Sequence, residues 1–268
     1  MQEHANIKRQ EERSILINFV LDKSGSMEVI RDATIAGFNQ FLHDQQQEGG
    51  SAAMTLTLFD TQFQTVVSAL PLAEVRPLDG RSYIPGGSTA LYDAIARTMA
   101  ITDEYVAAHK PDQVLFVIMT DGQENASREF GRRQIMEMIE NRQRTADYEF
   151  IYLGANQDAY AVGDGIGIRG GRSLDYAASP AETRKTMERV SSNVKAHRRL
   201  GEKVLTSHAF FSPELESLGK ESWAEHKSKR DQEAAGGAAD QRGVAGGGQA
   251  SGGTQGQPGA PGDREVER

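Results

Sequence analysis

The 268-residue sequence contains no cysteine. This absence excludes disulfide bonds, thiolate zinc sites and cysteine nucleophiles. No apolar segment approaches the roughly 20 residues that a membrane-spanning helix needs. The first residues, 1–13, are polar and contain no apolar stretch of signal length. We therefore expect a cytoplasmic protein with no membrane partner.

An excess of basic charge is also missing, because the formal net charge is −8. Nucleic-acid-binding proteins usually present a basic face, so we expect no nucleic-acid partner. Large apolar residues are almost absent after residue 233, where glycine and alanine dominate. A segment of this composition buries too little apolar surface to offset the entropy of ordering it. We predict that 234–268 is a disordered, glycine-rich tail.

Between residues 14 and 200, apolar runs of strand length alternate with segments of helical periodicity. Strands are expected at 14–21, 52–60, 63–70, 113–120, 149–154 and 173–177. Helices are expected around 30–42, 91–106, 135–139 and 180–194. The second and third runs are close enough to form a hairpin. The alternation predicts an α/β fold: a doubly wound, mostly parallel sheet with one antiparallel edge strand and helices on both faces.

The segment that follows this predicted domain, 201–233, carries apolar residues in a polar setting. They are Phe210, Phe211, Leu215, Leu218 and Trp223. Docking back onto the domain and a linear motif for a partner are both open interpretations, and continuity with the last helix favours docking. We divide the chain into a polar N-terminal extension (1–13), the α/β domain (14–200), a partly ordered extension (201–233) and the tail (234–268).

Oxygen-bearing side chains follow the predicted strands at the edge where open α/β sheets bind their ligands. The first strand leads into Asp22, Ser24 and Ser26, and the strand at 113–120 leads into Asp121. Thr89 stands just before the second helix. Ligands that are all oxygen suit hard cations, Mg²⁺ above all, with Mn²⁺ or Ca²⁺ as alternatives. The pattern therefore predicts a divalent cation site.

The segments "DKSGSM", "GGSTALYDAI" and "TDG" together resemble the von Willebrand factor type A (VWA) domain family, of the stand-alone bacterial cytosolic type. The signature of this family is the metal-ion-dependent adhesion site (MIDAS). It consists of Asp-x-Ser-x-Ser followed by a Thr and an Asp from two later loops. The resemblance covers roughly residues 14–200, and the matching positions are Asp22, Ser24, Ser26, Thr89 and Asp121.

The resemblance implies a role for each of these residues. Ser24, Ser26 and Thr89 would supply hydroxyl ligands, and Asp22 and Asp121 would coordinate directly or through water. The remaining coordination position would accept a Glu or Asp carboxylate from a partner protein. We therefore expect a metal-dependent protein–protein interaction module that is not an enzyme.

Two other functions stay open. A magnesium-dependent phosphohydrolase could use an aspartate after the first strand as its nucleophile, as haloacid-dehalogenase-like phosphatases do. Those enzymes have a second aspartate where this chain has Ser24, which cannot act as the acid and base. An adaptor or scaffold in an AAA+ ATPase or stress-response complex is suggested by the family resemblance alone.

Several other residues have simpler interpretations. Ser88 suits the N-cap of the second helix. Asp93 lies one helical turn after Thr89, and we expect a solvated helix residue there rather than support for the site. The six histidines are far apart in mostly polar settings, and we expect them at the surface.

Overall fold

A computed structural model describes residues 13–145, 148–168, 171–200, 210–211 and 228. The elements below all belong to the compact unit Met1–Lys227. The predicted N-terminal extension up to residue 12, most of the extension 201–233, and the tail 234–268 lie outside the described residues.

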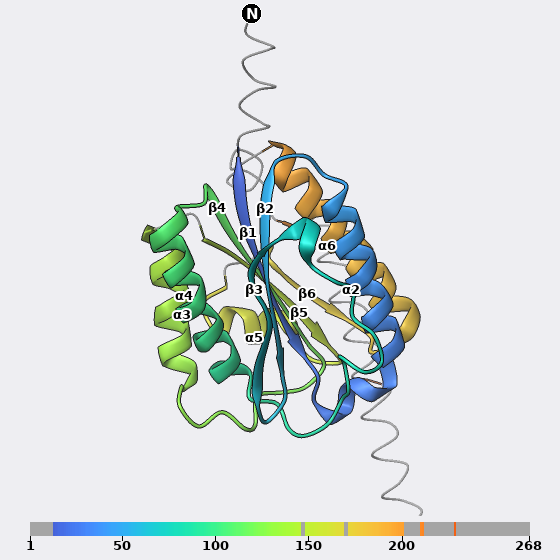
Figure 1. Cartoon of the computed structure of the whole chain (residues 1–268). Coiled ribbons are helices and arrows are strands. Elements are labelled where there is room, and N and C mark those ends of the chain that lie inside the picture. The colour runs from blue at the N-terminus through green and yellow to red at the C-terminus, as the bar shows by residue number, and fades with distance from the viewer. Residues whose placement is uncertain (1–12, 146–147, 169–170, 201–209, 212–227, 229–268) are drawn as a thin grey trace, which may run out of the picture. The chain divides into compact units, whose positions relative to one another are not determined.

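The described core is a six-stranded sheet with the order β3-β2-β1-β4-β5-β6 (Figure 1). Its strands are β1 (Ser14–Asp22), β2 (Ser51–Phe59), β3 (Phe63–Pro71), β4 (Gln113–Thr120), β5 (Tyr148–Ala155) and β6 (Ser173–Tyr176). All neighbouring strands are parallel except β2 and β3, which form the predicted antiparallel hairpin. The expected mostly parallel sheet with one antiparallel edge strand is therefore confirmed.

Helices cover both faces of the sheet. The α-helices are α2 (Arg31–Gln46), α3 (Leu91–His109), α4 (Arg132–Thr145), α5 (Ala159–Gly165) and α6 (Pro180–Leu200). Two short 3₁₀ helices are η1 (Gly25–Ile30) and η2 (Leu72–Glu74). In Figure 1, α2 and α6 lie side by side on one face, and α3 and α4 lie on the other. The chain therefore has the expected doubly wound α/β architecture.

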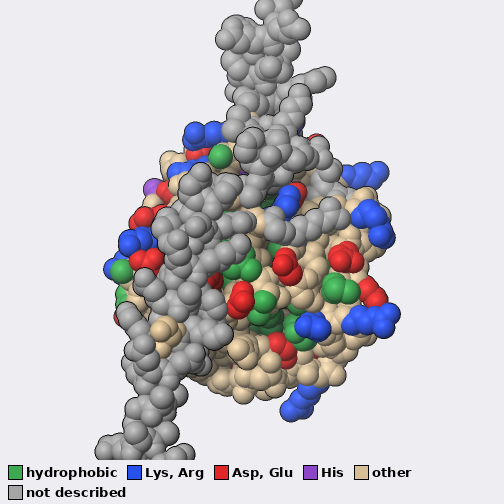
Figure 2. Space-filling view, turned by 180° about the vertical axis from the view of Figure 1, so that it is seen from behind, with side chains coloured by type: hydrophobic (Ala, Val, Ile, Leu, Met, Phe, Trp, Pro, Cys, Tyr) green, Lys and Arg blue, Asp and Glu red, His purple; other side chains and the backbone are tan. Residues whose placement is uncertain are grey.

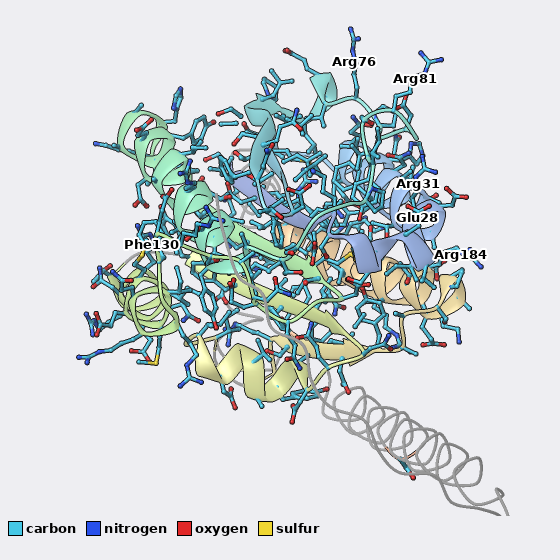
Figure 3. The ribbon with its side chains drawn as sticks, turned by 90° about the horizontal axis from the view of Figure 1, so that it is seen from below. Glu28, Arg31, Arg76, Arg81, Phe130 and Arg184 are labelled. Carbon is cyan, nitrogen blue, oxygen red and sulfur yellow. The ribbon has the colours of Figure 1, made fainter. Side chains whose placement is uncertain are left out.

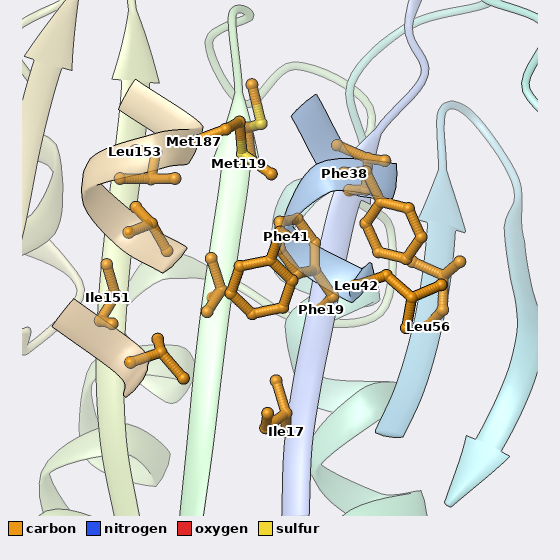
Figure 4. Close-up of a cluster of buried hydrophobic side chains, with 14 of the residues drawn as sticks. Ile17, Phe19, Phe38, Phe41, Leu42, Leu56, Met119, Ile151, Leu153 and Met187 are labelled. Atoms are coloured by element: carbon orange, nitrogen blue, oxygen red, sulfur yellow. The ribbon is translucent and has the colours of Figure 1, made fainter. Parts of the chain in front are cut away.

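The central strand β1 is buried on both faces, which explains its nearly continuous apolar sequence. Phe19 points toward α2, where its ring meets the rings of Phe38 and Phe41 edge-on, with ring-centre distances of 5.3 and 5.4 Å (Figure 4). On the opposite face, the buried Asn18 side chain accepts a hydrogen bond of 2.8 Å from the Thr102 hydroxyl of α3. These contacts lock β1 between the two helical layers.

The sheet has a topological switch point at the carboxyl ends of β1 and β4. From β1 the chain runs through α2 to β2 on one side, and from β3 it returns through α3 to β4 on the other. The two connecting helices cover opposite faces of the sheet, and open α/β sheets bind their ligands beyond the strand ends at such a point. Asp22 ends β1 and Asp121 follows β4, so both lie at this switch point.

The expectation of surface histidines is wrong at one position, and one helix was missed. His197 is buried in α6, with 3% of its surface exposed, whereas we expected a surface residue. The short helix α5 was not anticipated because seven residues with two glycines carry little helical periodicity. Its start is marked by an N-cap, because the Asp158 carboxylate accepts a hydrogen bond of 2.9 Å from the backbone N–H of Ala161.

Part of the extension after α6 is described and packs against the domain. Phe210 and Phe211 are buried in the core cluster beneath α2 and α6. The backbone N–H of Phe211 donates to the carbonyl of Gly171 at 3.0 Å, and the Asn193 amide donates to the carbonyl of Phe210 at 2.8 Å. Docking is thus observed for these two phenylalanines, while Leu215, Leu218 and Trp223 lie outside the described residues.

The surface is mixed in character. On the visible part of the back of the molecule, acidic and basic side chains are interspersed with apolar ones (Figure 2). Among the described residues, no helix is both long and apolar enough to cross a bilayer. The large apolar side chains that stand exposed in this part of the chain are Val29, Val66 and Ile84.

Candidate metal centre

The parallel pairing of β1 with β4 brings two carboxylates to one edge of the sheet. Asp22 is fully buried at the end of β1, and Asp121 is half-buried at the start of the loop after β4. Between them, the first loop turns into η1 and carries Ser24 and Ser26. Ser24 is buried and Ser26 is exposed, so the site is open to solvent on the Ser26 side.

The side chains of the first loop are tied to both carboxylates. The Ser26 hydroxyl donates to Asp121 Oδ1 at 2.6 Å, and Ser26 Oγ lies 3.3 Å from Ser24 Oγ. Asp22 Oδ1 accepts from the backbone N–H of Ser24 at 2.6 Å, and its Oδ2 accepts from the Thr120 hydroxyl at 2.5 Å. Both oxygens of the buried Asp22 carboxylate are therefore held in fixed directions.

Thr89 reaches the same place from the loop before α3. It is buried, with 2% of its surface exposed, and its backbone N–H donates to Asn125 Oδ1 at 3.0 Å. Its hydroxyl lies directly against Gly122, because a Cβ atom added at Gly122 would lie 2.5 Å from Thr89 Oγ1. Gly122 follows Asp121, so all five predicted residues converge at the switch point.

Burial makes the two carboxylates costly to ionise in the absence of a cation. Burial above all, with the nearby charge of Asp121 and against the hydrogen bonds from Thr120 and Ser24, raises the pKa of Asp22 to about 6. Burial also raises the pKa of Asp121. Lys23, which is adjacent in sequence, pairs with Asp60 rather than with either carboxylate. Such a pair of desolvated carboxylates is electrostatically suited to a bound cation.

The spacing of the oxygens fits a small octahedral ion. Ligands at 2.0–2.1 Å in an octahedron have neighbouring oxygens about 2.9 Å apart. The Ser26–Asp121 and Ser24–Ser26 oxygen distances of 2.6 and 3.3 Å bracket that value. Among the described residues, no three His, Cys, Asp or Glu side chains gather as a metal-binding group. A site here would depend on hydroxyls as much as on carboxylates.

A set of backbone and side-chain hydrogen bonds holds the first loop in place. The backbone N–H of Gly25 donates to the carbonyl of Gly87 at 3.1 Å, and that of Gly86 donates to the carbonyl of Lys23 at 2.8 Å. The hydroxyl of Tyr83, which is fully buried, donates to the backbone carbonyl of Asp22 at 2.5 Å. The segment before Thr89 therefore supports the loop that carries the serines.

Two further carboxylates, whose role the sequence did not reveal, order the loop after Asp121. Asp93 accepts hydrogen bonds from the backbone N–H groups of Arg128, Glu129 and Phe130 at 2.8, 3.1 and 2.9 Å. Glu124 accepts from the backbone N–H of Tyr92, at the start of α3, at 3.0 Å. Our expectation of a solvated Asp93 is therefore wrong.

Ser88 also differs from its prediction. The helix α3 begins at Leu91, and its N-cap residue is Ala90, which has no side-chain capping bond. Ser88 is exposed, and its backbone N–H donates to the Thr61 hydroxyl at 2.8 Å. Other side chains accept hydrogen bonds from the free backbone N–H groups at the start of α3. Glu124 accepts from Tyr92, and the Ser127 hydroxyl accepts from Asp93 at 3.1 Å.

Comparison with protein-family models and with curated protein sequences finds no match. Solved structures do match. Proximal thread matrix protein 1 from the mussel byssus, with a zinc-occupied MIDAS motif, aligns at a TM-score of 0.51 and 14% identity over 69% of this chain and 46% of its own. The vWF domain of the type V pili tip protein Mfa5 from Porphyromonas gingivalis aligns at a TM-score of 0.51 and 11% identity, over 71% of this chain and 98% of its own.

These alignments establish the fold. The chain has the fold of von Willebrand factor type A domains, as the sequence motifs implied. It spans 46–47% of the length of the mussel protein, and nearly all of the Mfa5 domain is covered. The candidate metal centre lies where the β1 and β4 strand ends meet in this fold.

Proposed function

We propose that this protein is a metal-dependent protein–protein interaction module. Asp22, Ser24, Ser26, Thr89 and Asp121 would hold a divalent cation, with Mg²⁺ favoured and Mn²⁺ or Ca²⁺ as alternatives. Bound there, the cation would supply a positive centre that accepts a carboxylate from outside. The partner would be a protein with an exposed Asp or Glu, and an AAA+ ATPase or a stress-response complex remains the candidate that the resemblance suggests.

The convergence of three neutral hydroxyls and two carboxylates carries this proposal. Both oxygens of Asp22 already accept hydrogen bonds from Thr120 and Ser24, so part of its negative charge is shared with protein donors. A cation held mainly by hydroxyls and water keeps affinity for another anion. Because Ser26 is exposed while Ser24 and Thr89 are buried, an incoming carboxylate would approach from the Ser26 side.

The geometry of Asp22 also speaks for binding rather than catalysis. A phosphohydrolase needs a nucleophilic carboxylate that can reach its substrate. Asp22 is fully buried, and its oxygens are occupied by the Thr120 hydroxyl and a backbone N–H. Ser24 stands where a second carboxylate would act as acid and base. The fold of a VWA domain bearing a MIDAS motif, which holds zinc in the mussel protein, agrees with a binding role.

Calorimetric titration with MgCl₂, MnCl₂ and CaCl₂ tests the metal site directly. We expect uptake of one ion per chain, much weaker uptake in Thr89→Ala and loss of uptake in Asp121→Ala. Ser88→Ala is the matched control, because Ser88 is adjacent to Thr89 but exposed. Unchanged circular dichroism would show that the variants fold. Absence of uptake of all three ions by the wild-type chain would overturn the proposal.

A further inference from the structure

Two exposed apolar side chains flank the candidate metal centre. Val29 is 73% exposed and lies three residues after Ser26, in η1. Ile84 is 61% exposed and lies in the loop that supports the same serines. The third large apolar side chain that is exposed in the described part of the chain, Val66, is on the edge strand β3. Single exposed aliphatic residues are common at protein surfaces, so the significance of these two depends on their surroundings.

Arg31 contacts the loop that carries Ile84 and lines a hollow together with Val29. Its guanidinium donates to the carbonyl of Tyr83, the residue before Ile84, at 3.4 Å and to the carbonyl of Gly80 at 2.9 Å. Arg31 also lines a hollow of about 260 Å³ together with Val29. The hollow extends from the start of α2 to the start of α6, where Arg184 lines it. We call Val29, Arg31, Ile84 and Arg184 together the flanking surface.

Exposed arginines border the flanking surface. Figure 3, which looks toward the carboxyl ends of the strands, shows Glu28, Arg31 and Arg184 together and Arg81 beyond Arg31. Arg81 and Arg184 are exposed, and neither forms an ion pair with a described residue. Glu28 and Asp32 also line the hollow, so its charge alternates. The two exposed arginines could pair with acidic residues of a partner, whereas the hollow as a whole carries no excess of positive charge.

We propose that the partner is an extended acidic segment of another protein. One Asp or Glu of this segment reaches the cation beside Ser26, a large apolar residue within a few positions packs against Val29 and Ile84, and a further acid faces Arg81 or Arg184. An extended chain advances about 3.3 Å per residue, so these contacts need only a short stretch of sequence. This inference rests on the proposed metal-dependent function and adds the kind of sequence that is recognised.

A random peptide library displayed on phage tests the inference with the full chain loaded with MgCl₂. Peptides are eluted with EDTA, so that only metal-dependent binders are collected. We expect the eluted peptides to contain an acid followed closely by a large apolar residue. The tightest peptide is then synthesised, and its affinity is measured by fluorescence polarisation. We expect Val29→Ser/Ile84→Ser to weaken it by about tenfold or more.

Matched controls separate this surface from general effects. Val66→Ser removes the exposed apolar residue on β3 and should leave peptide affinity unchanged. Arg184→Glu should weaken binding by about threefold or more, most strongly at low salt. Arg133→Glu, at an 87% exposed arginine of α4, should not. Calorimetry should show the same Mg²⁺ affinity in wild type and in Val29→Ser/Ile84→Ser.

The possible failures are distinguishable. If EDTA-eluted peptides carry an acid without an apolar neighbour, and Val29→Ser/Ile84→Ser binds them normally, the flanking surface is wrong while the metal-dependent function stands. If the library yields no EDTA-eluted peptide while calorimetry still shows one bound Mg²⁺ per chain, the extended acidic segment is overturned and the metal site stands; if calorimetry also shows no bound ion, the proposed function is overturned as well. If the chain dimerises in Mg²⁺ and Val29→Ser/Ile84→Ser is monomeric, the surface belongs to a second copy of the chain, and the partner proposed here is wrong.

Discussion

Gly122 offers a sharp test of whether Thr89 takes part in the metal centre. A Cβ atom at Gly122 would lie 2.5 Å from Thr89 Oγ1, closer than such contacts occur, while its φ angle is outside the left-handed region. Gly122→Ala therefore leaves the backbone unstrained and forces the Thr89 hydroxyl to move by roughly 0.9 Å, from 2.5 Å to the 3.4 Å at which ordinary contact begins, or to rotate away. The substitution acts on one ligand without removing it.

We expect Gly122→Ala to weaken Mg²⁺ binding by about 10–100-fold, the usual effect of disturbing a ligand's support. The measurement is calorimetric titration with MgCl₂, accompanied by urea unfolding of the metal-free chain. Overpacking costs about 1–3 kcal/mol if the hydroxyl stays in place and less if it rotates. Gly86→Ala is the control in the same group of loops, because nothing lies within 4 Å of its added Cβ.

A double-mutant cycle decides between displacement of Thr89 and a general disturbance. Thr89→Ala removes the hydroxyl that the new methyl group would meet. In the Thr89→Ala background, Gly122→Ala should therefore cost little further Mg²⁺ affinity, since both changes act on the same atom. Equal losses in the two backgrounds, or wild-type affinity in Gly122→Ala alone, would refute the placement of Thr89 in the site.

Two further predictions concern stability. Asp93→Ala removes the acceptor of three backbone N–H groups, so we expect a loss of about 2 kcal/mol in urea unfolding and weaker Mg²⁺ binding, whereas Glu104→Ala, at an exposed position of the same helix, should change neither. Burial, together with the charges of Arg172 and Arg13, lowers the pKa of His197 from 6.5 to about 4. The unfolded chain therefore binds the extra proton first, and stability should fall by up to about 3 kcal/mol as the pH drops from 6.5 to 4. His197→Gln should flatten this dependence, and an unchanged slope would contradict the assignment.

The sequence was sufficient to predict that the residues of the candidate metal centre lie at one edge of the sheet, because most of them follow strand ends. Asp22, Ser24 and Ser26 are adjacent in one loop, and parallel pairing of β1 with β4 necessarily brings Asp121 to them. Thr89 was assigned through the family motif, and the structure places it against Gly122. Local spacing and sheet topology account for the predicted grouping of the other four residues, whereas Thr89 needed the family motif.

Support for the site depends on long-range contacts that leave no local pattern. Asp93 bonds to backbone groups 35–37 residues away, and the Tyr83 hydroxyl reaches Asp22, 61 residues away. The burial of His197 was predictable in principle. It lies three residues after Val194, which itself follows Met187 and Val190 at helical spacing, so His197 extends the buried stripe of α6. We expected His197 at the surface because histidine is polar, although the helical periodicity of α6 indicated a buried position.

The number of carboxylates at the site affects two quantities in opposite directions: the affinity for the cation and the affinity of the bound cation for a partner's carboxylate. Ser26 is exposed, and its hydroxyl lies 2.6 Å from Asp121 Oδ1. Ser26→Asp would add a third carboxylate, so Mg²⁺ affinity should rise by about tenfold, because ligand charge tunes affinity. The same charge would repel an incoming acid, and the EDTA-eluted peptide should bind about tenfold more weakly.

Ser26→Asn separates charge from shape, because it supplies a neutral oxygen ligand of similar size to aspartate. Ser26→Asn should therefore neither strengthen Mg²⁺ binding nor weaken peptide binding by the amounts expected for Ser26→Asp. Calorimetry with MgCl₂ and fluorescence polarisation with the peptide measure the two quantities on the same samples. If Ser26→Asp strengthened both together, the external carboxylate would not be compensating a shortage of negative charge at the cation. The hydroxyl-rich composition of the site would then have another cause, and the carboxylate-binding function would lose its physical basis.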